Sequence, residues 1–333
     1  MLAGLARLLA RYLTLAVAVV LLNFLIPRSL PGDSLSFGAG DGTDAAVPLS
    51  AAARERLRAY YHLDESVGRQ LALYLGDLGR GDLGRSVARS ESVGVLIADR
   101  LPWTLGLLLV SLLVSAAAGT AAGVVAGWVP GRSRDRTLTS LAGALAAVPE
   151  FLIAIGLLAL FSARLGWFPL FGGQTVFAER GGGTAGTLRQ ALDIAWHLAL
   201  PATALALAGA AGFLLLTRDA IAGTSRAPWL TTARAKGLQE RDVAIRHALP
   251  NVAIPLLTFV GLRLGSVLGG ALVIERVFGV PGLGLLGYEA IRARDYPLLQ
   301  ALFLLSSLGV LAANLLVDVA SLHLGSRRGL GRG

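Results

Sequence analysis

Cysteine is absent from the 333-residue sequence, and charged residues are scarce. Without cysteine the chain can form neither disulfides nor thiolate metal sites. Charged residues make up 15% of the chain and hydrophobic residues 54%, whereas soluble domains carry about 25% charged residues. With a mean hydropathy of +0.65, the composition places the chain in the membrane class before any motif is considered.

Lysine occurs once, at Lys236, and this scarcity excludes a standard nucleotide-binding loop. A P-loop needs Gly-Lys followed by Ser or Thr, but Lys236 is followed by Gly237. The metalloprotease pattern HExxH and the serine-hydrolase pattern GxSxG are also missing. We therefore expect no catalytic residues, metal or cofactor in this chain. The histidines are too scattered to form a local ligand cluster: His62, His197, His247 and His323.

Six apolar runs are long enough to cross a bilayer, which takes about 20 residues of helix. We therefore predict an all-α membrane protein with six transmembrane helices. The first run lacks a small-x-small cleavage pattern after it, so we expect it to be retained as a span. The runs are Leu8–Ile26, Leu101–Val129, Leu138–Ala163, Trp196–Thr217, Val252–Ile274 and Leu298–Leu322.

The net charge of +9 lies mostly in short loops between these runs, where membrane topology explains it better than nucleic acid does. With the N-terminus inside, the inside pieces carry 14 basic and four acidic residues, in accord with the positive-inside rule. We therefore expect both termini in the cytoplasm. The inside pieces are 1–11, 129–137, 218–250 and 321–333.

The predicted organisation has four parts. The first is a transmembrane helix with its cytoplasmic N-terminus, and an extracytoplasmic loop region follows. In that loop region we expect one helix from Ser50, as N-cap, to about His62, and another near Val67–Leu78. A five-helix core and a cytoplasmic tail complete the chain. The parts are 1–27, 28–100, 101–322 and 323–333.

Three charged residues lie within the predicted spans, at Glu150, Arg263 and Asp318. Such residues often mark ion or substrate pathways. Glu150 and Arg263 are candidates to line a translocation path, but each could instead pair with a neighbour or reach the membrane surface. For Asp318, near the inner end of the last span, pairing is the favoured interpretation. A secondary transporter that uses these charges for ion coupling is therefore the alternative function.

Glycines recur at four-residue spacing in two spans. Such a strip presents a smooth helix face on which another helix can pack closely. Packing within the chain is the favoured interpretation, and contact with a second membrane subunit is the alternative. The strips are Gly119, Gly123 and Gly127 in the second span, and Gly261, Gly265 and Gly269 in the fifth.

The polar, basic segment 231–250 lies between the fourth and fifth spans, on the predicted cytoplasmic side. Residues 231–236 favour a helix, Gly237 breaks it and residues 239–249 can resume it. Glycine readily takes the left-handed conformation that ends a helix. The segment therefore predicts two short helices with an elbow at Gly237, although its charge alone also fits an ordinary basic loop.

Within this segment, the runs Thr232–Leu238 and His247–Pro250 resemble the EAA loop of bacterial ABC importer permeases. Thr231, Thr232 and His247 depart from that loop's usual Glu, Ala and Ile. The TARAKGL form is typical of the dipeptide, oligopeptide and nickel branch. By this resemblance, the residues that couple the chain to an ATPase are Thr232, Ala233, Arg234, Ala235, Lys236, Gly237, Leu238, Arg241, Leu249 and Pro250.

Further segments extend the resemblance over nearly the whole chain and indicate the B-type permease of this branch. Two departures stand out, because Glu150 replaces a small polar residue and the usual DPR-type ending is missing. The matching segments are Leu30–Asp33, Arg80–Ser86, Arg100–Leu105, Val277–Gly284 and Ala293–Pro297.

The resemblance implies an ABC type I importer transmembrane domain in the bacterial plasma (inner) membrane. It implies a second permease subunit, two ATP-binding subunits and an extracytoplasmic solute-binding protein as partners. Di- or oligopeptides are the expected substrate class, with a nickel chelate or another small solute as the alternative. ATP hydrolysis is expected in the partner subunits, so this chain is predicted to be no enzyme and to bind no nucleic acid.

Overall fold

The computed structural model describes residues 2–29, 65–175, 184–225, 227–265 and 267–327. These residues form helices and connecting segments, with one isolated β-bridge between Arg85 and Ser92. The predicted helix from Ser50 to His62 and the segment Leu30–Asp33 lie outside the described residues. The predicted helix near Val67–Leu78 is confirmed as α3, Val67–Gly79.

Four predicted spans appear as single long helices. They contain apolar stretches long enough to cross a membrane, because a helix rises 1.5 Å per residue. Pro201 lies inside the third of these helices, and Pro102 inside the second. The four are α1 (Leu2–Ser29), α4 (Val93–Trp128), α7 (Thr184–Thr224) and α14 (Tyr296–Arg327).

The third apolar run is not one straight helix. It forms α5 (Ser133–Ala147) and α6 (Glu150–Leu157), continued by the π-helix η2 (Leu158–Arg164), with a bend of 96° between the two parts. Proline disfavours the helical conformation in the preceding residue. Val148, just before Pro149, is accordingly extended, with φ −89° and ψ 124°. Glu150 therefore begins a new helix at the bend.

The described residues of the fifth apolar run form α11 (Ala253–Gly265) and α12 (Val267–Phe278). A bend of 60° separates the start of α11 from the helical segment Glu240–Asn251 before it. After α12, α13 (Leu283–Ala293) leads to α14. With the two bent helix pairs each counted as one span, the described residues contain up to six candidate spans.

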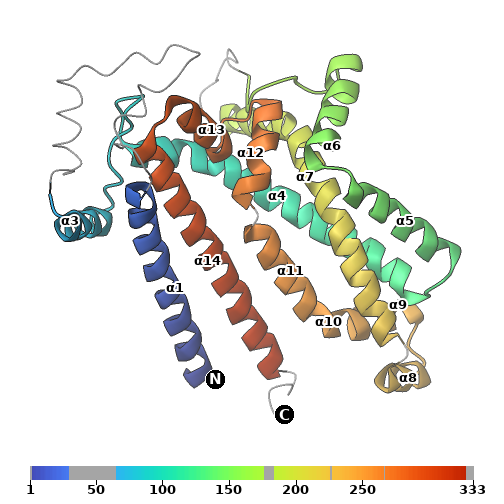
Figure 1. The fold of residues 1–333 in the computed structure, drawn as a ribbon. Helices are drawn as coiled ribbons and strands as arrows, with labels where there is room; N and C mark the ends of the chain where they lie inside the picture. The colour runs from blue at the N-terminus through green and yellow to red at the C-terminus, as the bar shows by residue number, and fades with distance from the viewer. Residues whose placement is uncertain (1, 30–64, 176–183, 226, 266, 328–333) are drawn as a thin grey trace.

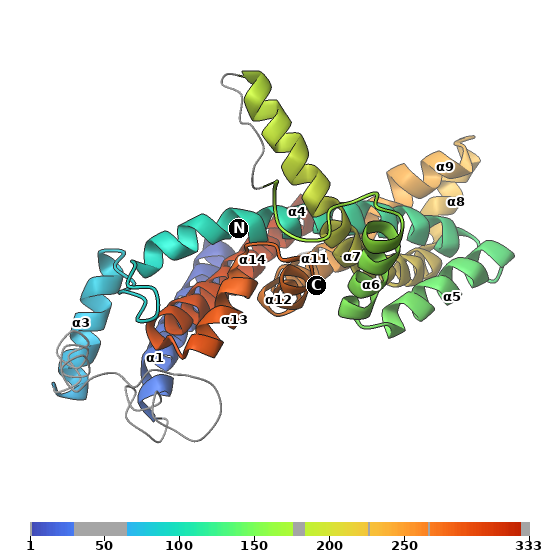
Figure 2. The same cartoon turned by 90° about the horizontal axis from the view of Figure 1, so that it is seen from above.

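Helix α4 runs across the molecule in both views, with α1 and α3 toward one end and α5 and α8 toward the other (Figures 1 and 2). The start of α1, the end of α14 and α8 all lie toward the lower side of Figure 1. The elements that follow the fourth span therefore share a side with both ends of the described chain, as the predicted topology requires.

The glycines of the second span pack inside this chain. A Cβ on Gly119, Gly123 or Gly127 would lie 2.4–2.7 Å from atoms of α7, including backbone oxygens. Gly261 similarly faces α14, where a Cβ would lie 3.2 Å from Asn314 and Val317. Packing within the chain is therefore the role of these glycines, and the second-span strip is not a free surface for another subunit. Gly265 and Gly269 lie among residues whose surroundings are not described.

Candidate coupling site

The segment between the fourth and fifth spans forms the predicted elbow. Helix α8 (Pro228–Ala235) begins with proline, whose fixed φ suits the first helical position. Gly237 then takes φ +77°, a left-handed conformation that costs glycine little and a β-branched residue much. The helical structure resumes as α9 (Glu240–Asp242), the π-helix η3 (Val243–Ala248) and α10 (Leu249–Asn251).

One face of the elbow is anchored in an apolar cluster. Leu230 of α8 and Val243 of η3 are fully buried against Ile221 of α7. Of the predicted coupling residues, Ala233 is buried in this cluster, and Leu249 packs against it. Burial of such side chains contributes roughly 25 cal/mol per Å² of apolar surface. The cluster therefore fixes the elbow to the end of α7.

The opposite face of the elbow is exposed and carries both apolar and basic side chains. Lys236 and Arg241, two of the predicted coupling residues, are exposed there. Leu238 is 39% exposed, and two residues missed by the sequence reasoning, Trp229 and Ile245, are 41% and 47% exposed. Each of these two residues has a buried neighbour in the sequence, so only the structure shows that its own side chain is exposed.

Arg234 has an acidic partner within the chain. Its Nε donates to Oε1 of Glu240 at 2.9 Å, across the elbow, and its Nη1 donates to the Ser225 carbonyl at 3.4 Å. Trp128, the last residue of α4, donates from Nε1 to Oε2 of Glu240 at 2.9 Å. The bond from Arg234 is the main reason why the pKa of the Glu240 carboxyl lies below its usual value. The sequence reasoning did not identify Glu240 as part of this site, although Glu240 is one of only two acidic residues in segment 231–250.

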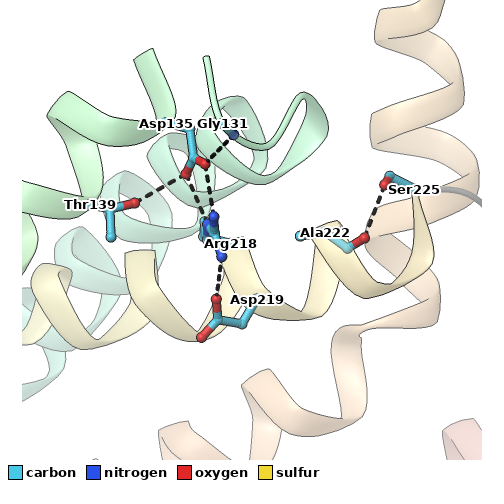
Figure 3. A network of polar contacts seen from close by, with 7 residues as sticks. All are labelled: Gly131, Asp135, Thr139, Arg218, Asp219, Ala222 and Ser225. Atoms are coloured by element: carbon cyan, nitrogen blue, oxygen red, sulfur yellow. Dashed lines mark hydrogen bonds and ion pairs between the residues drawn. The ribbon is translucent and has the colours of Figure 1, made fainter. Parts of the chain in front are cut away.

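A second polar network ties the base of α5 to α7 (Figure 3). The side chain of Asp135 is 3% exposed and receives two bonds of 2.8 Å from Arg218, through Nε and Nη2. The Gly131 amide and the Thr139 hydroxyl also donate to this carboxylate, at 2.7 and 3.1 Å. Nη1 of Arg218 reaches the exposed Asp219 at 2.9 Å. Such a bidentate, fully bonded pair is rigid.

The predicted path residues Glu150 and Arg263 are brought together although they lie 113 positions apart. Nη1 of Arg263 donates to Oε1 of Glu150 at 3.1 Å, and the two side chains are 29% and 33% exposed. The carboxylate lies at the first turn of α6, where the helix dipole favours negative charge. Asp318 accepts a bond of 2.8 Å from the Tyr12 hydroxyl, so the pairing expected for Asp318 is confirmed.

Other segments that carry the family resemblance, outside the elbow, also contact one another. Thr104 donates to the buried Glu275 at 2.6 Å and accepts from the Leu283 amide at 2.7 Å. Asp295, 1% exposed, accepts from the Ser86 hydroxyl. These contacts join segment 80–86 to 293–297, and 100–105 to 277–284. They were not predictable one by one, because their partners lie more than 170 positions apart in the chain.

An all-helical membrane protein with several spans and a rigid connecting elbow is the class of protein that these features define. The chain belongs to the family of binding-protein-dependent transport system inner membrane components, whose model matches residues 119–329. The match covers the end of α4, the elbow and all later spans. The chain is therefore a permease subunit of a binding-protein-dependent importer that works with other subunits of the transport system, and the predicted ABC importer permease is confirmed.

Curated relatives cover nearly the whole chain. It is 32% identical to the oligopeptide transport system permease protein AppB of Bacillus subtilis, over 91% of this chain and 92% of the relative. It is 35% identical to the glutathione transport system permease protein GsiC of Escherichia coli O6:H1, over 94% of each. The same protein of Pectobacterium atrosepticum is also 35% identical, again over 94% of each chain.

Proposed function

We propose that this chain imports di- or oligopeptides, including short thiol peptides of the glutathione type, as one of two permeases in an ATP-driven complex. The names of the similar permeases, for oligopeptides in one organism and glutathione in others, support this substrate class. The complex contains two ATP-binding subunits and an extracytoplasmic binding protein. The ligand that co-purifies with that binding protein tests the substrate class, because a nickel chelate in place of a peptide contradicts it.

The elbow is the proposed docking site for one ATP-binding subunit, on the cytoplasmic side together with both termini. The carrying observation is its two-sided construction. One face is buried in the Leu230–Val243 cluster, while the other exposes Trp229, Leu238 and Lys236. An exposed aromatic and aliphatic patch with basic neighbours is typical of a protein interface. Lys236 and Arg241 are available for acidic groups of the ATPase, whereas Arg234 acts inside the elbow.

Docking can be tested directly, because the natural chain contains no cysteine. A single cysteine at Gln239, which is exposed within the elbow, should be joined to an ATP-binding subunit of the assembled complex by a short thiol-to-amine cross-linker. A cysteine at the exposed Leu75 of α3, in the predicted extracytoplasmic region, serves as the matched control. Cross-linking of the ATPase to Leu75Cys rather than to Gln239Cys contradicts both the docking site and the orientation.

The conformation of Gly237 provides the functional test. Gly237→Val should lower substrate-dependent uptake strongly while the complex still inserts and hydrolyses ATP, since valine does not fit φ +77°. Gly223→Val is the matched control. At both glycines a Cβ would meet nothing within 4 Å, but only Gly237 has a positive φ. Uptake at the normal rate in Gly237→Val membranes would contradict a rigid coupling elbow.

The Glu150–Arg263 pair is proposed to line the translocation path. Both side chains are about one third exposed. Glu150 can bind the ammonium group of a peptide, and Arg263 can bind its carboxylate. The ion-coupled alternative has less support, because the three charges within the spans all have partners: Glu150 with Arg263, and Asp318 with Tyr12. Uptake that follows the proton gradient without an ATPase would favour that alternative.

A further inference from the structure

Trp128 joins the elbow to a helix outside it. The tryptophan ends α4, and its Nε1 donates to Oε2 of Glu240 at 2.9 Å. The other oxygen of Glu240 accepts from Arg234 at 2.9 Å. The guanidinium carbon of Arg234 lies 5.4 Å from the centre of the Trp128 ring, within the range of a cation–π contact. Three side chains from three elements thus close one cluster, here called the Trp128 latch (Trp128, Arg234 and Glu240).

The latch spans the elbow. Arg234 belongs to α8 and Glu240 begins α9, so their ion pair crosses Gly237. The first connection between the two short helices is the apolar cluster that contains Leu230 of α8 and Val243 of η3. The ion pair supplies a second connection between them. The bond from Arg234 to the Ser225 carbonyl adds a third attachment, at the end of α7.

Helix α4 is in turn packed tightly on α7. A Cβ on Gly123 would lie 2.6 Å from the Thr217 Cβ, and one on Gly127 would lie 2.4 Å from the Arg218 carbonyl oxygen. Two helices in such close contact move together, because there is no room between their backbones for independent sliding. A force applied to the elbow through Trp128 therefore reaches α4 and α7 as one unit. Arg218 passes it on to α5 through Asp135.

We propose that Trp128 is a positioning residue for transport coupling, which acts through Glu240 and Arg234 to make the elbow and α4 one rigid body. The proposal rests on the proposed docking of the ATPase at the elbow. When the ATPase moves the elbow, the latch converts that movement into displacement of α4 and α7. Without the latch, the elbow still docks and stays packed on α7, but its polar attachment to α4 is lost, and ATP is hydrolysed with less transport.

Two substitutions test the latch in the complete complex, reconstituted with its binding protein in proteoliposomes. Trp128→Phe keeps a ring over Arg234 and removes the N–H donor, and Glu240→Gln removes the charge at the same volume. Each should lower the amount of substrate imported per ATP hydrolysed by about fivefold, a smaller factor than for a buried charged bond because Glu240 is 57% exposed. Because both act on the same carboxyl group, the double variant should lose less than the product of the two single effects.

The matched control is Asp242→Asn. Asp242 also pairs with an arginine in this segment, Arg246 at 3.3 Å, but this pair stays within one helical stretch and links no two elements. An exposed i,i+4 pair of this kind contributes little. Substrate imported per ATP should therefore be unchanged in Asp242→Asn, although it loses the same type of charge as Glu240→Gln.

The outcomes separate the latch from the docking site. If Gln239Cys cross-links to the ATPase in the wild-type background and in both variants, but the substrate imported per ATP is unchanged, the latch is overturned and docking stands. If the wild-type background itself gives no cross-link, the docking proposal fails. Should Trp128→Phe not assemble, Glu240→Gln alone decides, because glutamine fills the same space as glutamate. A lower substrate-to-ATP ratio with cross-linking intact supports the latch.

Discussion

The start of α5 and the bend between α5 and α6 carry ion pairs of opposite character. At the base of α5, Asp135 is almost completely buried and accepts four hydrogen bonds, two of them from Arg218. At the bend, Glu150 is one third exposed and meets Arg263 at 3.1 Å through a single oxygen. The first arrangement leaves the carboxylate nothing further to bind. The second leaves oxygen lone pairs of Glu150 accessible.

The Asp135–Arg218 pair is therefore a fixed joint between α5 and α7, whereas the Glu150–Arg263 pair can exchange its partners. A buried carboxylate with all its bonds formed is costly to disturb, because removal of one partner leaves an uncompensated charge. A half-exposed pair is worth less and can open without that penalty. We infer that α5 moves with α7 as a unit at its base, while the bend can release Glu150 and Arg263 to a charged solute.

The largest effect is expected from breaking the fixed joint. Asp135→Asn leaves the guanidinium of Arg218, 27% exposed, without its main counter-charge. This should cost about 3 kcal/mol of stability, seen as a lower unfolding temperature of the purified complex in detergent. Asp219→Asn is the control, because Asp219 meets the same arginine but is 72% exposed. Equal changes in the two variants would show that burial does not distinguish these partners.

A smaller and different effect is expected at the bend. Glu150→Gln should lower uptake about tenfold, the factor for one hydrogen bond to a charged group, while the unfolding temperature changes less than in Asp135→Asn. The measurement is uptake by proteoliposomes at several substrate concentrations. Thr139→Val, which removes one hydroxyl donor to Asp135, controls for mild destabilisation near α5. Unchanged uptake together with a large loss of stability would reverse the roles assigned to the two pairs.

The smallest effect is expected when each arginine is replaced by lysine, which tests the bonding geometry of the two ion pairs. Lysine keeps the charge of arginine but cannot form its two parallel bonds to a carboxylate. Arg218→Lys should therefore cost about 1 kcal/mol, one net hydrogen bond, whereas Arg263→Lys should weaken its pairing with Glu150 less, because that pairing has one bond of 3.1 Å and not two. Unfolding temperatures of the two variants, measured at one scan rate, decide between them. An equal or larger loss for Arg263→Lys would contradict the single-contact geometry.

Local features of the sequence predicted several elements correctly. The left-handed preference of glycine placed the elbow at Gly237, which has φ +77°. The apolar runs located α1, α4, α7 and α14, because only about 20 apolar residues in a helix can cross the bilayer core. Pro149 was a visible signal for the bend in the third run, since proline restricts the residue before it, although the run was treated as a single span.

Contacts between distant positions could not be predicted in the same way. Glu150 and Arg263 were recognised separately as charges within spans, but no local pattern indicated that they face each other. Arg234 was predicted as a residue that couples the chain to an ATPase, and the structure pairs it with Glu240, which also accepts a bond from Trp128. The partner of a charge depends on how helices pack, and a helix period specifies a face without specifying which neighbour covers it.

By itself the sequence determined that this is a multi-pass helical membrane protein with a glycine elbow, and its motifs identified the permease family. Those properties depend on hydropathy, backbone preference and residue order, which are local. Only the tertiary structure decided that the second-span glycines pack on α7, that Asp135 is bonded to Arg218 and that Trp128 donates to Glu240 in the elbow. These depend on distances between helices, which arise when the whole chain packs at once.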